Sequence, residues 1–298
     1  MLFLSASTTL TSGADRAWLV DYLKSKKKPK MVQTAIARQV SFFALGAAIS
    51  FALSGIVVAF YSMTLLWYIE SFLVLLTGFF IMFFGREEFF RPRNIKLSGI
   101  LSENFRISGK SLKYALRHRV LFYLLAAQIF ISLGAASNVI WQPLMLEIGY
   151  PISMIGPIFA LVTLFGVVAP NLSMKYLSFF RNEKNSLIFG EAFLFLPYLL
   201  LAFVSNLSLF FILWVSVFVL ASLCMPIEDA YFQKYTPSKI RATTGSLKNM
   251  VGSAGSVVAP ALAGFLAEAF GLRSVIIFAA LMSIPVVLLY SRIKENPR

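Results

Sequence analysis

Three side chains in one long apolar stretch, Asn138, Trp141 and Gln142, have the types and the spacing to bind a solute. Positions 138 and 142 lie one turn apart on the same face of a helix, and Trp141 lies beside them. Pro143 follows directly and disturbs the hydrogen-bond ladder of such a helix. We therefore expect a broken helix here and contact between these side chains and a substrate, although polar side chains in apolar helices also serve to join neighbouring helices.

Reactive side chains elsewhere give no arrangement for catalysis. The chain has three aspartates, Asp15, Asp21 and Asp229, which are not grouped as a membrane transferase that holds metal-bound diphosphate requires. His118 lies in a basic connection without an acidic or His partner nearby, and Cys224 is the single cysteine. A Ser-His-Asp triad, a zinc site and a disulfide framework cannot be assembled from this set. We expect no enzymatic activity, no cofactor and no metal, with a membrane transferase as the rival class.

The composition requires a membrane as solvent. Apolar residues make up 58% of the 298 positions and only 13% are charged, a balance too apolar for a soluble globule. The formal net charge of +14 could indicate nucleic-acid binding. The Lys and Arg residues gather between the apolar runs, however, which is the topology signal of a protein with several membrane spans. We expect membrane lipids as partners and no nucleic acid.

Nine apolar runs follow one another along the chain. Eight have the roughly 20 residues that a helix needs to cross the hydrocarbon of a bilayer, whereas Asp15 and Arg16 interrupt the first. The runs lie at about 1–23, 36–60, 64–85, 120–146, 152–176, 186–205, 207–232, 243–267 and 273–291.

Basic residues occupy every second connection. Nine Lys or Arg lie in residues 86–119, and further groups follow the first, fifth and seventh runs. The alternate connections carry Glu147, Glu268 and Arg273 as their only ionisable groups. Because basic connections stay on the cytoplasmic side, we expect the C-terminus to be cytoplasmic and residues 147–151 to lie outside.

Two segments of the chain, residues 15–55 and 228–271, are faint copies of each other. Aligning Asp15 with Glu228 keeps an alanine, an aromatic residue and a tyrosine in step, and each copy then continues into a helix rich in Gly, Ala and Ser. Repeated apolar units with a binding site at their junction are typical of secondary transporters. The copies are six spans apart, so three further spans would precede Met1. Residues 1–85 would then be the remainder of an N-terminal half, residues 86–119 a cytoplasmic linker and residues 120–298 a six-helix C-terminal half.

Three segments resemble the drug-efflux-like members of the major facilitator superfamily. Residues 12–23, SGADRAWLVDYL, resemble the end of the family's fourth helix. Residues 141–161, WQPLMLEIGYPISMIGPIFAL, resemble its junction of helices seven and eight, and residues 236–256, TPSKIRATTGSLKNMVGSAGS, the entry to helix eleven. The resemblance implies an all-α integral membrane protein, a two-half helical bundle of the major facilitator type, with nine of an expected twelve spans and the first three helices lacking.

The same resemblance bears on the polar residues of the spans. It implies that Asn138, Trp141 and Gln142 lie on a cavity-lining helix, and that Glu70 and Glu191 lie on peripheral helices, where pairing or contact with lipid headgroups is expected ahead of ion coupling. Protons are a candidate coupling ion. The family's Gly-, Asp- and Arg-rich loop has its second-half counterpart at residues 170–184, which keep basic residues but have no Asp. That motif therefore does not carry proton coupling over to this chain.

Charges at the ends of the repeated spans could form a cytoplasmic gate. A pseudo-two-fold axis would bring the acidic helix ends of each half to the basic helix starts of the other, and only while the cytoplasmic side is closed. Contact with lipid headgroups is the alternative role for such flanking charges. The acidic members are Asp15 and Asp21 in the first half and Glu228 and Asp229 in the second; the basic members are Arg38 in the first half and Arg241 and Lys248 in the second.

These observations together predict a secondary transporter in the cell membrane. It would move a small solute by alternating access, with a cavity between its two halves. Efflux of an amphiphilic compound would suit the aromatic and aliphatic spans. The alternative is a truncated membrane protein that does not transport, because three spans of the expected pattern would be missing.

Overall fold

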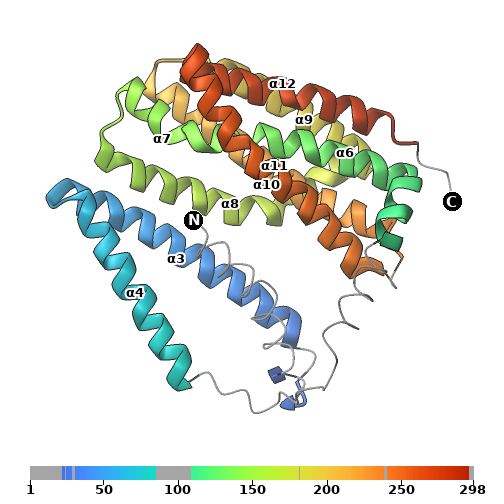
Figure 1. Ribbon diagram of the computed structural model, residues 1–298, viewed down its shortest axis with the longest axis horizontal. Coiled ribbons are helices and arrows are strands. Elements are labelled where there is room, and N and C mark those ends of the chain that lie inside the picture. The colour runs from blue at the N-terminus through green and yellow to red at the C-terminus, as the bar shows by residue number, and fades with distance from the viewer. Residues whose placement is uncertain are drawn as a thin grey trace. The chain divides into compact units, whose positions relative to one another are not determined.

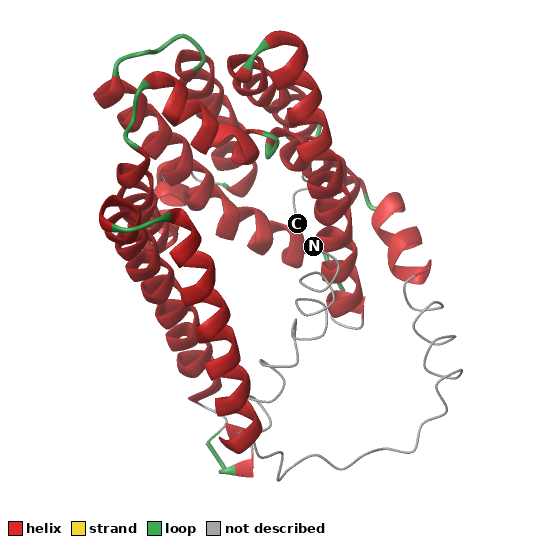
Figure 2. Cartoon of the chain, turned by 60° about the vertical axis from the view of Figure 1, so that its left-hand side comes forward, coloured by secondary structure: helices red, strands yellow, loops and turns green. Residues whose placement is uncertain are grey.

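The computed structural model describes residues 22–23, 25–28, 31–84, 109–180, 182–237 and 240–294. Within these ranges the regular elements are helices, joined by short loops and turns (Figure 2). Eight of the described helical stretches are long and apolar enough to cross a membrane, and they correspond to the second to ninth apolar runs. The first run lies almost entirely outside the described residues. The expectation of an all-α membrane protein is thus confirmed.

The chain forms two compact units, Met1–Asn94 and Ile95–Arg298. In the N-terminal unit the structure describes helix α3 (Val32–Phe60) and helix α4 (Met63–Phe84), joined by a two-residue connection and packed on each other (Figure 1). Large apolar side chains such as Phe43, Trp67 and Phe83 are exposed on these helices. Apolar side chains on every face suit a helix surrounded by lipid and other helices.

In the C-terminal unit, seven helices lie wholly within the described residues and pack as a bundle (Figure 1). Helix α12 packs against α9 and α6, α10 packs against α8 and α9, and α11 packs against α6. Asparagine caps begin two of the helices: Asn182 Oδ1 accepts from the backbone N–H of Asn185, and Asn206 Oδ1 accepts from that of Leu209. The helices are α6 (Arg119–Gly134), α7 (Ser137–Ile148), α8 (Ile152–Phe180), α9 (Glu183–Leu201), α10 (Leu207–Lys234), α11 (Arg241–Phe270) and α12 (Leu272–Ser291).

The fourth apolar run is broken, but not where the sequence placed the break. Pro143 lies inside α7, and the helix is interrupted at Ala135 and Ala136, between α6 and α7. One missing backbone N–H is tolerated within a membrane helix. The interruption coincides with a close approach to α12, since a Cβ on Gly134 would lie 3.5 Å from Met282 Cβ. Small residues, rather than the proline, therefore mark the break.

Two buried clusters fill the bundle. The aromatic cluster contains Trp141, Phe210 and Trp214. The tyrosine cluster contains Tyr231 and Tyr290 with neighbouring leucines of α6. Trp214 of the first cluster and Tyr231 of the second are seventeen positions apart on α10, so these two side chains lie about 26 Å apart along that helix. The clusters thus form opposite ends of the C-terminal unit.

Arg273 contacts residues of several helix termini at the end of the C-terminal unit that holds the aromatic cluster. Its guanidinium donates to the backbone oxygen of Ala202 at 3.2 Å and to Ser205 Oγ at 3.0 Å. Its Nε also lies 3.7 Å from Glu147 Oε1. One arginine thus joins the starts and ends of three helices at this end of the bundle.

Candidate functional site

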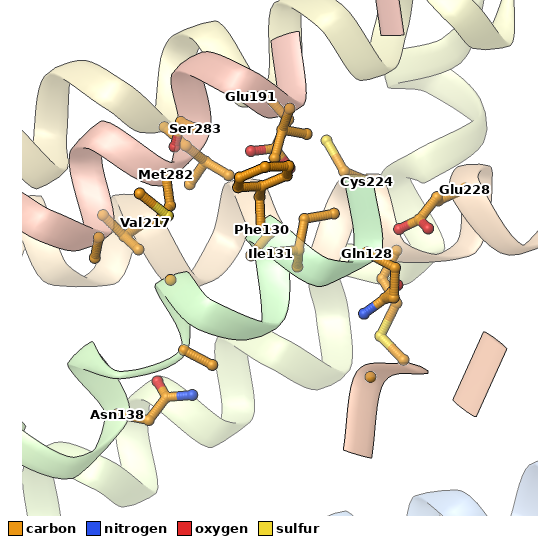
Figure 3. A pocket seen from close by; sticks show the side chains of 18 of the residues that line it. Gln128, Phe130, Ile131, Asn138, Glu191, Val217, Cys224, Glu228, Met282 and Ser283 are labelled. Atoms are coloured by element: carbon orange, nitrogen blue, oxygen red, sulfur yellow. The ribbon is translucent and has the colours of Figure 1, made fainter. Parts of the chain in front are cut away.

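A cavity of about 640 Å³ opens within the C-terminal unit. Six of these seven helices supply its lining, and α8 supplies none of the lining residues. Figure 3 shows lining side chains, among them Gln128, Glu191 and Glu228. A volume of this size matches the pockets that hold small molecules. Its polar and charged lining residues are Gln128, Asn138, Glu191, Tyr198, Glu228, Asp229, Lys248, Asn249, Ser253, Ser256 and Ser283, and its aromatic ones are Phe130, Trp141, Trp214 and Phe218, with Tyr198.

Two of the three side chains singled out in the sequence line this cavity, and the third does not. Asn138 is exposed and lines it, and Trp141 lines it while being only 4% exposed. Gln142 is exposed but is not among the lining residues. The face of α7 that lines the cavity therefore includes positions 138 and 141, three residues apart, but not position 142. Contact of all three with a substrate stays a prediction.

The aromatic end of the cavity consists of Trp141, Tyr198 and Trp214. The Trp141 ring lies 5.3 Å from that of Trp214 and 6.4 Å from that of Tyr198, between centroids. Ser137 Oγ lies 3.4 Å from the Tyr198 hydroxyl, so this phenol has a hydrogen-bond partner at the cavity wall. The end is rigid because its rings pack on one another as well as on the aromatic cluster.

The charged end of the cavity consists of Glu228, Asp229 and Lys248. Lys248 Nζ lies 2.6 Å from Asp229 Oδ1, in a hydrogen bond, and 3.0 Å from Glu228 Oε1. The side chains of Lys248 and Glu228 are each 11% exposed, whereas that of Asp229 is 56% exposed. The Glu228 contact is an ion pair without hydrogen-bond geometry, so this carboxylate oxygen is buried with only part of its capacity used.

These contacts join α10 to α11 within one unit, which the sequence did not predict. Lys248 was expected to pair with acidic residues of the other half, and Glu228 or Asp229 with Arg38. Arg38 is exposed on α3 of the N-terminal unit. Asp15 and Asp21 lie outside the described residues, as does the side chain of Arg241, so the pairing between halves stays a prediction. Lys248 can enter such a gate only by sharing or leaving its present partners.

Glu191 is a cavity residue that the sequence placed at the periphery. It lines the cavity from α9, close to the point where α9 meets α10 (Figure 3). Gly190 makes that approach possible, because a Cβ there would run into the sulfur of Cys224. Among the described residues, the Glu191 carboxylate has neither a hydrogen bond nor an ion pair. The one signal in the sequence was an acidic residue inside an apolar run, which marks a functional candidate but not the face it occupies.

Small residues let α6 and α11 meet along the cavity. A Cβ on Gly255 would overlap Ser132, and a Cβ on Gly252 would lie 3.3 Å from Gln128 Nε2. Gln128 in turn donates to Ser132 Oγ at 3.3 Å. Gly252 and Gly255 therefore serve helix packing, while Ser253 and Ser256 beside them line the cavity.

Comparison with known proteins gives a consistent result. The family profile described as Major Facilitator Superfamily matches residues 16–225 and 174–298. The chain is also similar to an uncharacterized MFS-type transporter, YxaM, of Bacillus subtilis (strain 168). The two are 22% identical over 317 residues, which cover 99% of this chain and 74% of the relative.

Proposed function

Because the chain belongs to the major facilitator superfamily, we propose that it moves a small solute across the membrane by alternating access. It is a multi-pass membrane protein of a transporter family. The proposal is that its cavity opens first to one side of the membrane and then to the other.

The observation that carries the proposal is the composition of the cavity wall. Side chains that can bind a solute come from six helices and surround one space of about 640 Å³. Ordinary contacts between membrane helices use small residues and a few polar pairs, as α6 and α11 do. A wall with carboxylates, amides, hydroxyls and indoles exceeds what packing needs and fits a binding site.

We take the solute to be amphiphilic and its movement to be efflux through the cell membrane. The aromatic end suits an apolar body, and the amides and carboxylates suit a polar group. The basic connections favour a cytoplasmic C-terminus. A thiol at Ser205→Cys should then react with an impermeant reagent added outside cells, and one at Lys184→Cys should not. The reverse pattern would invert the orientation.

Transport by purified protein tests the proposal. We expect reconstituted protein in proteoliposomes to exchange at least one compound of an amphiphilic panel faster than empty vesicles do. Asn138→Trp should block that exchange by filling the cavity, whereas Val139→Trp, on the neighbouring exposed position of α7, should not. If wild-type protein exchanges none of the panel, a non-transporting membrane protein becomes the better account. Imposed pH gradients across the same vesicles test protons as the coupling ion.

A further inference from the structure

We propose that the transported solute carries a positive charge and that Glu191 binds this charge. The inference names the substrate class of the cavity described above and so rests on the proposed transport function. It depends on three features of the cavity: the balance of its charges, the pairing of its lysine and the position of its aromatic rings.

The charge balance of the cavity favours a cation. Its acidic lining residues are Glu191, Glu228 and Asp229, and Lys248 is its basic one. Acidic side chains thus outnumber basic ones, although the chain as a whole carries a formal net charge of +14. A wall with an excess of one sign of charge and apolar surroundings concentrates solutes of the opposite sign.

The lysine is not available to hold an anion. Its ammonium group lies within 3.0 Å of both Glu228 and Asp229, and its side chain is largely buried. An anionic solute would have to displace these partners and leave a buried carboxylate without its counter-charge. Glu191 has no such partner among the described residues. An unpaired carboxylate in an apolar span is costly, and a bound cation would remove that cost.

Glu191 is positioned for a solute with both a charge and an apolar body. On α9 it lies seven residues, or two turns, from Tyr198, so the two share a face about 10 Å apart. Gly190 meets Cys224, which precedes Glu228 by about 6 Å along α10. The carboxylate therefore lies between the charged end and the aromatic end. A cationic group at Glu191 would place its apolar body against rings that also attract positive charge.

Three probes with one biphenyl-like body separate the charge classes. They are N-methyl-4-phenylpyridinium, a permanent cation; 4-phenylpyridine, which is neutral in mildly alkaline buffer; and biphenyl-4-carboxylate, an anion. Equilibrium dialysis of the full-length protein in lipid nanodiscs measures their binding. We expect the cation to bind at least about tenfold more tightly than the other two, as expected for one additional pairing to a charged group.

Variants identify the residue that binds the charge. Glu191→Gln keeps the shape of the side chain and removes its charge, so it should weaken binding of the cation about tenfold or more while leaving the neutral probe unchanged. Glu191→Asp keeps the charge and should retain most of the affinity. Glu268→Gln, an exposed carboxylate of α11 that is not among the lining residues, is the matched control and should bind like wild type.

Each outcome of the binding series decides the inference. Equal binding of the three probes, preferred binding of the anion, or no binding of the cation overturns it, whatever the variants do. Loss of cation binding in Glu268→Gln as well as Glu191→Gln would also contradict it. Transport is scored separately in proteoliposomes: flux of a neutral or anionic solute without cation binding refutes this inference alone, and cation binding without any flux refutes the transport proposal.

Discussion

The two ends of the cavity are built on different physical principles. At the aromatic end, Trp141 and Trp214 are almost fully buried and contribute to the core as well as the wall. At the charged end, Lys248 holds Glu228 and Asp229 between two helices. The first end cannot change shape without cost to the fold, whereas the second is held by contacts that other charges could replace. We therefore expect the aromatic end to be rigid and to select the shape of the solute, and the charged end to rearrange.

The largest effect should come from the aromatic end. Trp214→Ala removes a side chain that is 2% exposed and lies 4.9 Å, between ring centroids, from Phe159. We expect a loss of about 3–5 kcal/mol in the free energy of unfolding, measured by denaturation in mixed micelles. Trp67→Ala is the matched control, because Trp67 is 68% exposed on α4 and should cost far less. Equal losses for the two tryptophans would remove the distinction between this end and the exposed surface of α4.

A smaller loss of stability is expected at the charged end, where a second substitution should restore part of it. Lys248→Met leaves Glu228 buried without its counter-charge and should cost about 3 kcal/mol of stability. Adding Glu228→Gln should recover part of that loss, because the buried negative charge is then gone as well. Thermal unfolding of the single and double variants measures both effects. A double variant as unstable as the Lys248→Met protein would show that the ion pair does not define this end.

Between the two ends, packing alone should decide stability. Gly255→Ala places a methyl group against Ser132, where α6 and α11 touch, and should cost about 1–3 kcal/mol. Gly264→Ala lies on the same helix with no atom within 4 Å of the added Cβ. It should be neutral or slightly stabilising, since alanine favours a helix. Comparable losses of stability at both positions would mean that glycine is needed for its backbone conformation and not for the contact between α6 and α11.

The smallest effect concerns pH and His118, which lies beside the tyrosine cluster. Its ring stacks on Tyr114 at 5.6 Å and lies 5.4 Å from the ring of Tyr235, between centroids. Burial lowers the pKa of His118 below its usual 6.5. The unfolded chain therefore takes up the proton first, and stability falls as the pH drops through 6.5 and then through the lower pKa of the folded protein. His118→Gln should reduce the dependence of the melting temperature on pH over this range. An unchanged slope of melting temperature against pH would show that other groups cause it.

Hydropathy and charge predicted the existence of the helices far better than the faces they present. Eight apolar runs became spanning helices because length and apolar content are sufficient for that inference. The rotation of each helix about its own axis was not predictable, because an apolar side chain is about equally stable in lipid and in the interior of the bundle. The family resemblance assigned Glu191 to a peripheral helix, whereas the structure places it in the cavity wall. Gln142 is exposed and is not among the lining residues of this cavity, and its contact with a substrate stays a prediction.

The pairing of Lys248 was missed for a related reason. Repeat symmetry suggested partners in the other half, but α10 and α11 are consecutive antiparallel helices, so acidic residues near the end of one readily meet a lysine near the start of the next. The break at Ala135 and Ala136 likewise lies where α6 contacts α12, next to Gly134. Contacts of this kind are fixed by three-dimensional packing, which the order of residues in one chain does not show.

Solute exchange through a cavity that can be blocked from one position tests the central claim most directly. In a Cys224→Ser background, Asn138→Cys places a reactive thiol in the wall, and Val139→Cys places one on the neighbouring exposed position of α7. The measurement is the exchange rate in proteoliposomes, before and after a bulky thiol reagent, of the panel compound that wild-type protein moves fastest. We predict that modification of position 138 abolishes exchange and that modification of position 139 leaves it intact. Full exchange after complete modification at position 138 would show that solutes do not pass through this cavity.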